Sequence, residues 1–227
     1  DRADSSLDYF TARLLRIYPG LLSALLLTTF LIGVVFTVRP LAEYLTDNET
    51  YNYITGGLSL YSTRFQLPGV FEDNPLPAIN GSLWTLLYEA LLYLMAGALG
   101  TAAIFDPKRH RFLWFLISYG VLYVAYKIAA AHIPSVEALS RVQAFFATSL
   151  PFVLGMTLYR YRSHITLRAL WLIPLITLAV WSYHEVYFIE CLVAAWVYLI
   201  FYLGFTGVPL LERYNLLGDY SYGVYIY

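Results

Sequence analysis

The sequence predicts an all-α membrane protein, a polytopic bundle of transmembrane helices. Of its 227 residues, 59% are hydrophobic and only 13% are charged, whereas soluble domains contain roughly 25% charged residues. The mean hydropathy is +0.61, and a soluble fold of this size could not bury so much apolar surface. The hydrophobic residues form long continuous runs, which lipid allows only as helices, and they lack the alternation of barrel strands.

Six of these runs are long enough to cross the hydrocarbon layer, which takes about 20 helical residues. A seventh run begins near Leu216. We therefore expect six full spans and the start of a seventh. The six runs cover residues 14–38, 83–104, 112–130, 142–159, 167–183 and 187–206.

The basic residues predict how the spans are oriented. If the first run starts in the cytoplasm and each later run reverses direction, ten of the fourteen Lys and Arg residues lie on the cytoplasmic side. Cytoplasmic loops of membrane proteins carry such an excess of Lys and Arg. We therefore expect the N-terminal end of the chain to be cytoplasmic.

Residues 39–82 form the one long loop of the single domain predicted over residues 1–227, and this orientation makes the loop extracytoplasmic. It is rich in Pro, Gly and acidic residues, and its middle is too polar to span. Loops of this length are usually functional or disordered. The aromatic content favours an ordered lid or an interfacial segment. A simple connector is the alternative.

Arg13 and Arg16 are the first candidate site residues, because their spacing places them on one face of a helix at its cytoplasmic end. Two guanidinium groups on one face can clamp the phosphates of a cytosolic ligand. The alternative is ordinary positive-inside flanking with lipid phosphate contacts. Pro19 follows within the same run and should kink it, which would help to open a cleft.

Glu89 is the second candidate, because an acid within a membrane span is costly unless it is paired or protonated, and such acids are commonly functional. Thr85, Glu89 and Tyr93 follow one another at intervals of four and form a polar stripe on one helix face. Small residues, which allow another helix to approach closely, continue this stripe at Ala96, Gly97 and Gly100.

A structural role for Glu89 is the alternative, through a hydrogen bond or an ion pair to another helix. Arg39 and Lys127 are the candidate partners for such a pair. Trp84 precedes the stripe and is either an interfacial anchor or a platform for an acceptor molecule.

The remaining polar residues give weaker indications. Glu190 lies near His184, but residues this close in sequence do not face each other along a helix, which favours an interfacial role. The four histidines lack metal-ligand spacing, and Cys191 is the only cysteine. The net charge is −1, without the basic patch of a nucleic-acid-binding protein. We therefore expect no metal and no nucleic-acid partner.

Three segments resemble, in order, the signature motifs of the acyltransferase-3 family. YFTARLLRIYP resembles its aromatic, Arg-x-x-Arg and Pro signature, and NGSLWTLLYEALLYL resembles its Trp-Ser/Thr-Leu-x-x-Glu span. LGDYSYGVYIY resembles its closing Gly-x-x-Ser-Tyr-x-x-Tyr segment. The ordered set extends over the whole chain.

The resemblance implies a membrane O-acyltransferase of about ten membrane-spanning helices. Such an enzyme moves an acyl group, often acetyl, from cytosolic acyl-CoA to a hydroxyl of an extracytoplasmic or membrane-linked glycan. The expected partners are thus acyl-CoA as donor substrate, a glycan or lipid-linked saccharide as acceptor, and the lipid bilayer, with no bound cofactor. The expected location is a bacterial inner membrane.

The resemblance also implies roles for particular residues. Arg13 and Arg16 would bind the acyl-CoA, Glu89 would be catalytic, and Trp84, Thr85 and Tyr93 would line the substrate cavity with it. The family's catalytic histidine belongs upstream of Asp1, so we expect a chain that is truncated at both ends. His132 or His184 would be the substitutes within the chain, although neither lies in a family motif.

Two other classes of function compete with this one. Intramembrane carboxylates and kinked helices also mark the pathways of transporters and flippases for lipid-linked or small polar substrates. A non-catalytic membrane subunit or receptor is the third hypothesis, and it predicts that Arg16 and Glu89 tolerate alanine.

Overall fold

A computed structural model describes residues 6–102, 104–105, 110–133, 137–206 and 221–226. These residues are helical or irregular, and the only β pairing among them is an isolated antiparallel bridge between Thr37 and Val70. The all-α prediction is therefore confirmed. Chain contacts gather in two compact units, residues 1–101 with 219–227 (unit 1) and residues 102–218 (unit 2).

Five helical segments are long and apolar enough to cross a membrane within the described part of the chain. The predicted span over 167–183 instead contains a shorter apolar helix, Ala169–Trp181, bounded by extended Arg168 and by Ser182. The predicted start of a seventh span falls largely outside the described residues. The count of six to seven spans is thus not confirmed. The five segments are Leu7–Phe36, Gly81–Thr101, Arg111–His132, Leu139–Arg160 and Phe188–Phe205.

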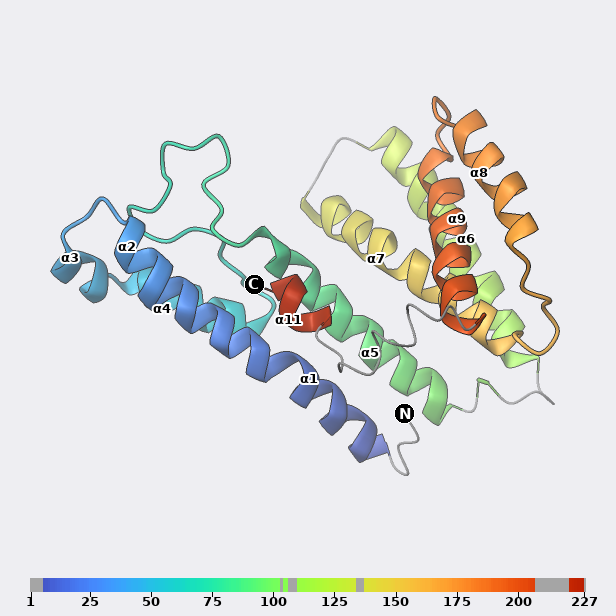
Figure 1. The fold of residues 1–227 in the computed structure, drawn as a ribbon, viewed down its shortest axis with the longest axis horizontal. Helices are drawn as coiled ribbons and strands as arrows, with labels where there is room; N and C mark the ends of the chain where they lie inside the picture. The colour runs from blue at the N-terminus through green and yellow to red at the C-terminus, as the bar shows by residue number, and fades with distance from the viewer. Residues whose placement is uncertain (1–5, 103, 106–109, 134–136, 207–220, 227) are drawn as a thin grey trace. The chain divides into compact units, whose positions relative to one another are not determined.

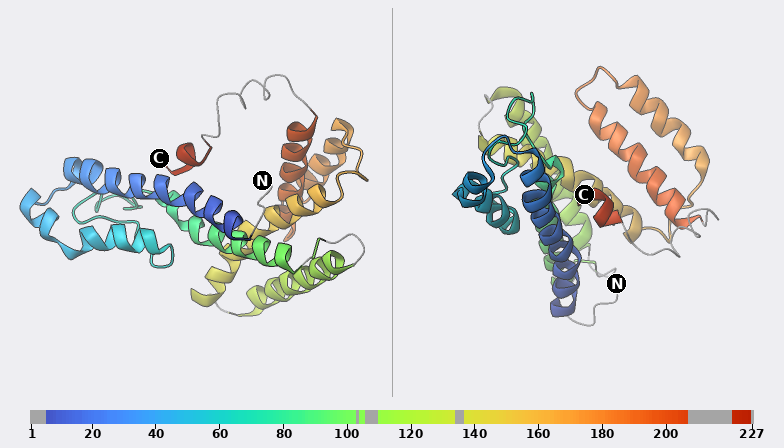
Figure 2. Two further views of the ribbon diagram at one scale, coloured as in Figure 1. Left: turned by 90° about the horizontal axis from the view of Figure 1, so that it is seen from below. Right: turned by 60° about the vertical axis from the view of Figure 1, so that its left-hand side comes forward.

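Unit 1 is organised around its first helix (Figures 1 and 2). The described elements are α1 (Ser6–Leu27), η1 (Thr28–Gly33), α2 (Val34–Phe36), α3 (Leu41–Thr46), α4 (Asn48–Ser59), η2 (Gly81–Thr85), α5 (Leu86–Thr101) and α11 (Ser221–Ile226). Helix α1 contacts α4, α5 and α11. It thereby connects the segment 39–82, which contains α4, to α5 and to α11.

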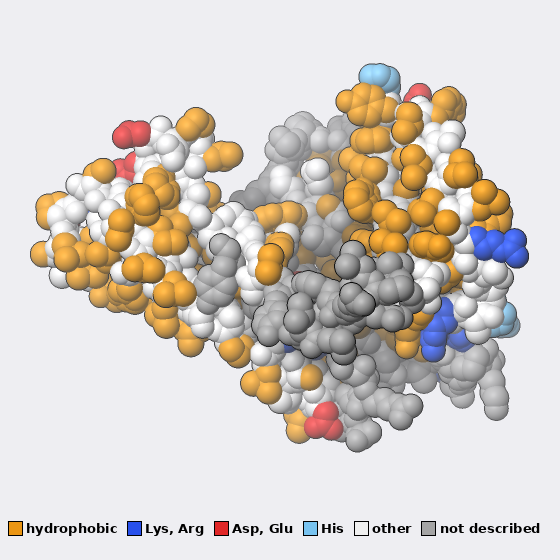
Figure 3. Space-filling model, in the orientation of Figure 1, with side chains coloured by type: hydrophobic (Ala, Val, Ile, Leu, Met, Phe, Trp, Pro, Cys, Tyr) orange, Lys and Arg blue, Asp and Glu red, His pale blue; other side chains and the backbone are white. Residues whose placement is uncertain are grey.

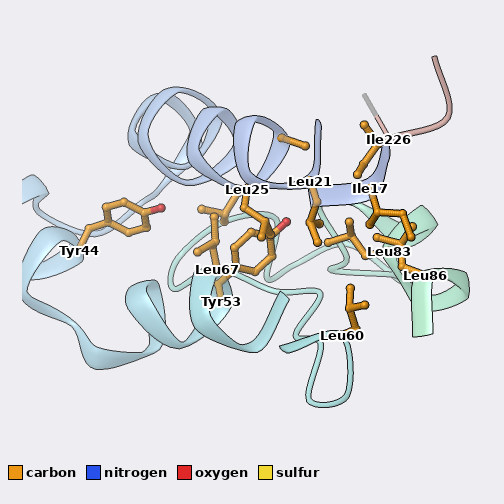
Figure 4. Packing of buried hydrophobic residues seen from close by; sticks show 12 residues of the cluster. Ile17, Leu21, Leu25, Tyr44, Tyr53, Leu60, Leu67, Leu83, Leu86 and Ile226 are labelled. Carbon is orange, nitrogen blue, oxygen red and sulfur yellow. The ribbon is translucent and has the colours of Figure 1, made fainter. Parts of the chain in front are cut away.

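One hydrophobic cluster holds these elements together. Ile17 of α1, Leu83 and Leu86 of η2 and α5, and Ile226 of α11 are each at most 3% exposed and belong to the same cluster (Figure 4). Each of the three motif segments supplies a residue to it. Segments that are far apart in the sequence thus meet in one core.

Residues 39–82 are a folded part of unit 1. Asp47 caps α4, because its Oδ1 accepts a hydrogen bond from the Glu49 backbone N–H at 2.9 Å. Tyr44 of α3 and Tyr53 of α4 are completely buried in the cluster around α1. The segment is therefore ordered and packs against α1.

The first span contains an irregular turn after Pro19, the residue at which the sequence predicts a kink. Helix α1 passes through Pro19 as one continuous helix, and the irregularity is the π-helical turn η1. There the Tyr44 hydroxyl donates to the Thr29 carbonyl at 2.8 Å. A Cβ on Gly33 would lie 2.0 Å from the Tyr44 hydroxyl oxygen, so the absence of a side chain allows this approach.

Unit 2 contains α6 (Arg111–His132), α7 (Glu137–Arg160), η3 (Ala169–Trp171), α8 (Leu172–Trp181) and α9 (Phe188–Phe205). Helix α9 contacts α7 and α8, and α6 contacts α7. Most hydrophobic side chains on α6 are exposed, and Phe112 is its one buried residue. Figure 3 shows hydrophobic side chains over much of the visible surface. Such surfaces are expected for helices that face lipid.

Candidate functional site

The candidate site lies along the face of α5 that receives α1. A Cβ on Gly97 would lie 2.6 Å from Cζ of Phe10 and 3.3 Å from Cε1 of Tyr9. The predicted close approach of another helix is therefore confirmed at Gly97. The prediction is wrong at Gly100, where a Cβ would meet no atom within 4 Å.

Arg13 is held between two aromatic rings at this approach. Its Cζ lies 5.2 Å from the centroid of the Tyr9 ring and 4.9 Å from that of Tyr93. The Tyr9 hydroxyl also donates to the Tyr93 backbone carbonyl at 3.2 Å. Cation–π contacts of this kind restrict the orientation of a guanidinium group. The half-buried Arg13 is thus fixed in position by its neighbours.

Tyr93 connects this cation to Glu89. The Tyr93 hydroxyl donates to Glu89 Oε1 at 2.5 Å. Both side chains are half-buried. A carboxylate has further acceptor sites on both oxygens. Glu89 can therefore hold Tyr93 and still accept a hydrogen bond from a substrate hydroxyl.

The predicted ion pairs of Glu89 are wrong. Arg39 instead pairs with Asp47, at 3.0 Å, and Lys127 pairs with Glu190, at 2.8 Å. In the described ranges no Lys or Arg nitrogen lies within 4.0 Å of Glu89. The hydrogen bond that the structural alternative predicted does exist, but it joins Glu89 to Tyr93 of the same helix.

The Thr85 end of the stripe is hydrogen-bonded to the third motif. The hydroxyls of Thr85 and Tyr225 are hydrogen-bonded, and Tyr225 also donates to the Ser82 carbonyl at 2.9 Å. Asn80 Nδ2 donates to the Ile226 carbonyl at 2.8 Å. The first and second motifs therefore meet at Arg13 and Tyr93, and the second and third meet at Thr85 and Tyr225.

We call Arg13, Tyr93, Glu89 and Thr85 the polar seam. Thr85 and Tyr93 are eight residues apart, which is about 12 Å along an α-helix. The seam thus extends over a considerable part of the membrane thickness, with a cation at one end and hydroxyls at the other.

Two predicted site residues lie beside the polar seam. Trp84 is 45% exposed, and its ring packs against Tyr88 with centroids 5.9 Å apart. Arg16 is exposed on α1, where it interacts electrostatically with Tyr93, as Arg13 does. Sequence analysis missed Tyr9 and Tyr225, since their partners lie in distant segments. The aromatic positions of the first and third motifs were the available signal.

Unit 2 holds a second intramembrane acid in a different environment. Glu190 Oε1 lies 2.8 Å from Lys127 Nζ and accepts a hydrogen bond from the Tyr123 hydroxyl at 2.5 Å. Lys127 also donates to the Val186 carbonyl at 3.2 Å. This cluster joins α6 to α9. Sequence patterns could not predict this pair, since 63 residues separate the two charges.

The histidines and the acids form no metal site among the described residues, where no three His, Cys, Asp or Glu side chains gather. His132 Nδ1 lies 2.8 Å from the carbonyl of Ile128, one turn earlier. The His184 ring packs edge-on against Tyr183. Both histidines belong to unit 2.

Comparison with known proteins gives one sequence relative. The chain is 26% identical over 234 aligned positions to a protein of Shigella phage Sf6 named O-acetyl transferase. The alignment covers the whole of this chain and 66% of the relative, so the chain spans about two thirds of the relative's length. No protein family profile matches the chain, and no solved structure matches it.

Proposed function

We propose that this protein is a membrane O-acetyltransferase, which moves an acetyl group from cytosolic acetyl-CoA to a hydroxyl of an extracytoplasmic or membrane-linked glycan. The observation that carries the proposal is the polar seam, which connects a positioned cation to a half-buried carboxylate and a hydroxyl cluster. The name of the phage relative supports acetyl transfer. The placement in a bacterial inner membrane belongs to the same proposal.

Arg13 and Arg16 bind the donor in this proposal. Acyl-CoA carries phosphates, and guanidinium groups bind phosphate oxygens through charge-assisted hydrogen bonds. The helical segment Leu7–Phe36 has 30 residues, about 45 Å of helix, whereas the hydrocarbon layer is about 30 Å thick. Part of this helix therefore extends beyond the hydrocarbon, and in this proposal the extending part is its first turns, where Arg13 and Arg16 meet a water-soluble ligand.

Glu89 serves the transfer step. The acceptor oxygen attacks the thioester carbonyl carbon, the new C–O bond forms and the C–S bond breaks. The proton of the hydroxyl ends on the departing thiolate, giving CoA and the acetyl ester. A carboxylate in this position accepts the proton of the hydroxyl or hydrogen-bonds the base that does so. Tyr93 orients Glu89 for this role.

Acetyl transfer in membrane vesicles tests the proposal. Vesicles that hold the natural protein, with its cytoplasmic face outward, are supplied with labelled acetyl-CoA, and the label in the glycan is measured. Arg13→Gln and Arg16→Gln should each raise the KM for acetyl-CoA about tenfold, because each removes charged hydrogen bonds to phosphate.

Arg162→Gln is the matched control. It removes a cation from the predicted cytoplasmic side, where Arg162 lies over the Tyr159 ring at 4.0 Å, and its KM should equal that of the wild type. An equal KM in all four proteins would contradict the donor assignment. A glycan that receives no label from the wild-type protein would contradict the proposed function.

Translocation of a lipid-linked saccharide is the second candidate, since a polar path through a span also suits a transporter. The same vesicles distinguish the two. A flippase moves its substrate without acetyl-CoA and leaves it unmodified, whereas the transferase gives an ester whose formation depends on the donor. If the chain is a non-catalytic subunit, the Glu89→Ala variant should label the glycan as well as the wild type does.

A further inference from the structure

Unit 1 contains a polar cavity of about 510 Å³ in the segment that is predicted to be extracytoplasmic. Small-molecule sites usually measure about 300–1,000 Å³. The charged residues in its lining are Arg39, Asp47, Glu49, Arg64 and Glu72. The cavity is distinct from the polar seam, because none of the four seam residues lines it.

These charged side chains hold one another in place. Arg39 lies 3.0 Å from Asp47 and 3.6 Å from Glu72. Glu72 in turn accepts a hydrogen bond from the Gly69 backbone N–H at 2.7 Å. Arg64 pairs with Glu49 at 2.5 Å. The donors and acceptors around the cavity are therefore positioned before any ligand arrives.

The balance of charge indicates the class of ligand. Three carboxylates and two guanidinium groups line the cavity, a formal charge of 2 − 3 = −1. Each arginine is already paired with an acid, so both positive charges of the lining are neutralised before an anionic ligand could bind. Hydroxyl groups both donate and accept hydrogen bonds, so adjacent guanidinium and carboxylate groups suit them. A neutral polyhydroxyl compound therefore fits better than a phosphate.

The walls also offer an apolar surface. Phe65 and two prolines, Pro68 and Pro77, line the cavity beside the charged groups. Leu67 and Val70 connect the wall to the buried cluster of unit 1, where they are 2% and 0% exposed. A sugar ring has an apolar face and a hydroxyl edge, and this lining presents a partner for each.

We propose that this cavity binds a neutral saccharide unit of the acceptor. The identification of the saccharide as the acceptor rests on the proposed acetyl transfer. Saccharide binding itself does not depend on that function. A saccharide held here would be anchored on the segment that packs directly against α1. It would also explain why residues 39–82 are folded around a charged hollow.

Saturation-transfer NMR tests binding without any transfer reaction. The natural protein, in a detergent without a sugar headgroup, is mixed with lactose, cellobiose and a rhamnose disaccharide, and with inorganic phosphate and glucuronic acid as charged competitors. We expect saturation transfer to at least one disaccharide and no displacement by either charged competitor.

The double variant Arg64→Gln/Glu49→Gln removes one charged pair from the lining. Both side chains are about half exposed, at 52% and 51%, so the fold should survive their loss. The disaccharide Kd should rise about tenfold or more, since charged hydrogen-bonding groups are lost. Asp73→Asn, an exposed acid of the same segment outside the lining, should leave the Kd unchanged.

Three results would overturn the inference: no disaccharide bound, displacement by a charged competitor, or equal Kd values in the double variant and the wild type. Thermal unfolding of each variant shows that a lost signal is not a lost fold. Binding without acetyl transfer would contradict the proposed function alone. Acetyl transfer with an unchanged glycan KM in the double variant would contradict the cavity assignment alone.

Discussion

Glu89 of unit 1 and Glu190 of unit 2 are both carboxylates within membrane-spanning helices, but their surroundings differ. Glu190 has a lysine at 2.8 Å and a tyrosine on the same oxygen, while its Oε2 is buried without a described hydrogen-bond partner. Glu89 receives one hydroxyl and has no described cation within salt-bridge distance. Glu190 is therefore held by a neighbouring cation, whereas the described contact of Glu89 is with the Tyr93 hydroxyl.

The aromatic residues around the two acids differ in the same way. Tyr123 belongs to a set of rings in unit 2 that includes Tyr119, Tyr126 and Phe146. Tyr93 instead contacts Arg13, a residue of another helix and another motif. The rings around Tyr123 thus contact one another within unit 2. The polar seam of unit 1 instead extends to Arg13, towards the predicted cytoplasmic side.

The largest effect on stability is expected from breaking the unit 2 pair. Lys127→Ala leaves Glu190 without its cation and should reduce the free energy of unfolding by about 2–3 kcal/mol, less than a fully buried pair because the two side chains are 34% and 23% exposed. The apolar double replacement Lys127→Met/Glu190→Leu should restore most of it. Thermal unfolding in detergent measures both. A double variant that is as unstable as Lys127→Ala would show that the pair is not the cause.

The next effect concerns the approach of α1 to α5. Gly97→Val places a branched side chain against Phe10 and should cost about 2 kcal/mol, as overpacking does. Gly100→Val is the matched control one turn later, where the space is open, and it should be nearly neutral. Equal unfolding temperatures for the two variants would contradict the described approach.

A smaller effect is expected from the link within the polar seam. Tyr93→Phe keeps the ring next to Arg13 but removes the hydroxyl that donates a hydrogen bond to Glu89. The kcat for acetyl transfer should fall about tenfold, which corresponds to the loss of roughly one hydrogen bond to a charged group. The KM for acetyl-CoA should not change. Tyr88→Phe, which removes the hydroxyl of the residue directly before Glu89 but outside the seam, is the control. A raised donor KM with unchanged kcat would assign Tyr93 to binding.

The last effect on stability appears at alkaline pH. Burial raises the pKa of both Tyr44 and Tyr53 from 10.0 to about 12. Between these values the folded chain keeps protons that the unfolded chain loses, so stability is full below pH 10 and falls as the pH rises towards 12. Tyr44→Phe should make this decline shallower. An unchanged pH profile of urea unfolding in the variant would contradict the assignment.

Local patterns in the sequence predicted the helical class, the polar stripe on α5 and the small-residue contact at Gly97. These features depend on helix periodicity, which one segment carries by itself. Partners across the chain were harder to predict. Arg39 and Lys127 were expected near Glu89, but Arg39 finds three acids close by in its own loop and Lys127 finds Glu190 on a neighbouring helix.

The fifth predicted span, residues 167–183, shows a related difficulty. Hydrophobic content extends over 167–183, but Arg168 adopts an extended conformation and the helix ends before Ser182. Apolar composition alone does not state where a helix begins and ends. The motif resemblance gave what periodicity could not, since it grouped three distant segments that pack together in unit 1.

Parallel labelling of the glycan by two variants tests the central claim most directly. Glu89→Gln and Lys127→Met/Glu190→Leu each remove an intramembrane carboxylate, and both are compared with the wild type at equal amounts of inserted protein. We predict that Glu89→Gln lowers acetyl transfer about 100-fold or more, as loss of an acid–base group does, while the unit 2 double variant keeps its activity. Equal losses in both variants, or full transfer by Glu89→Gln, would contradict the assignment of the reaction to the polar seam.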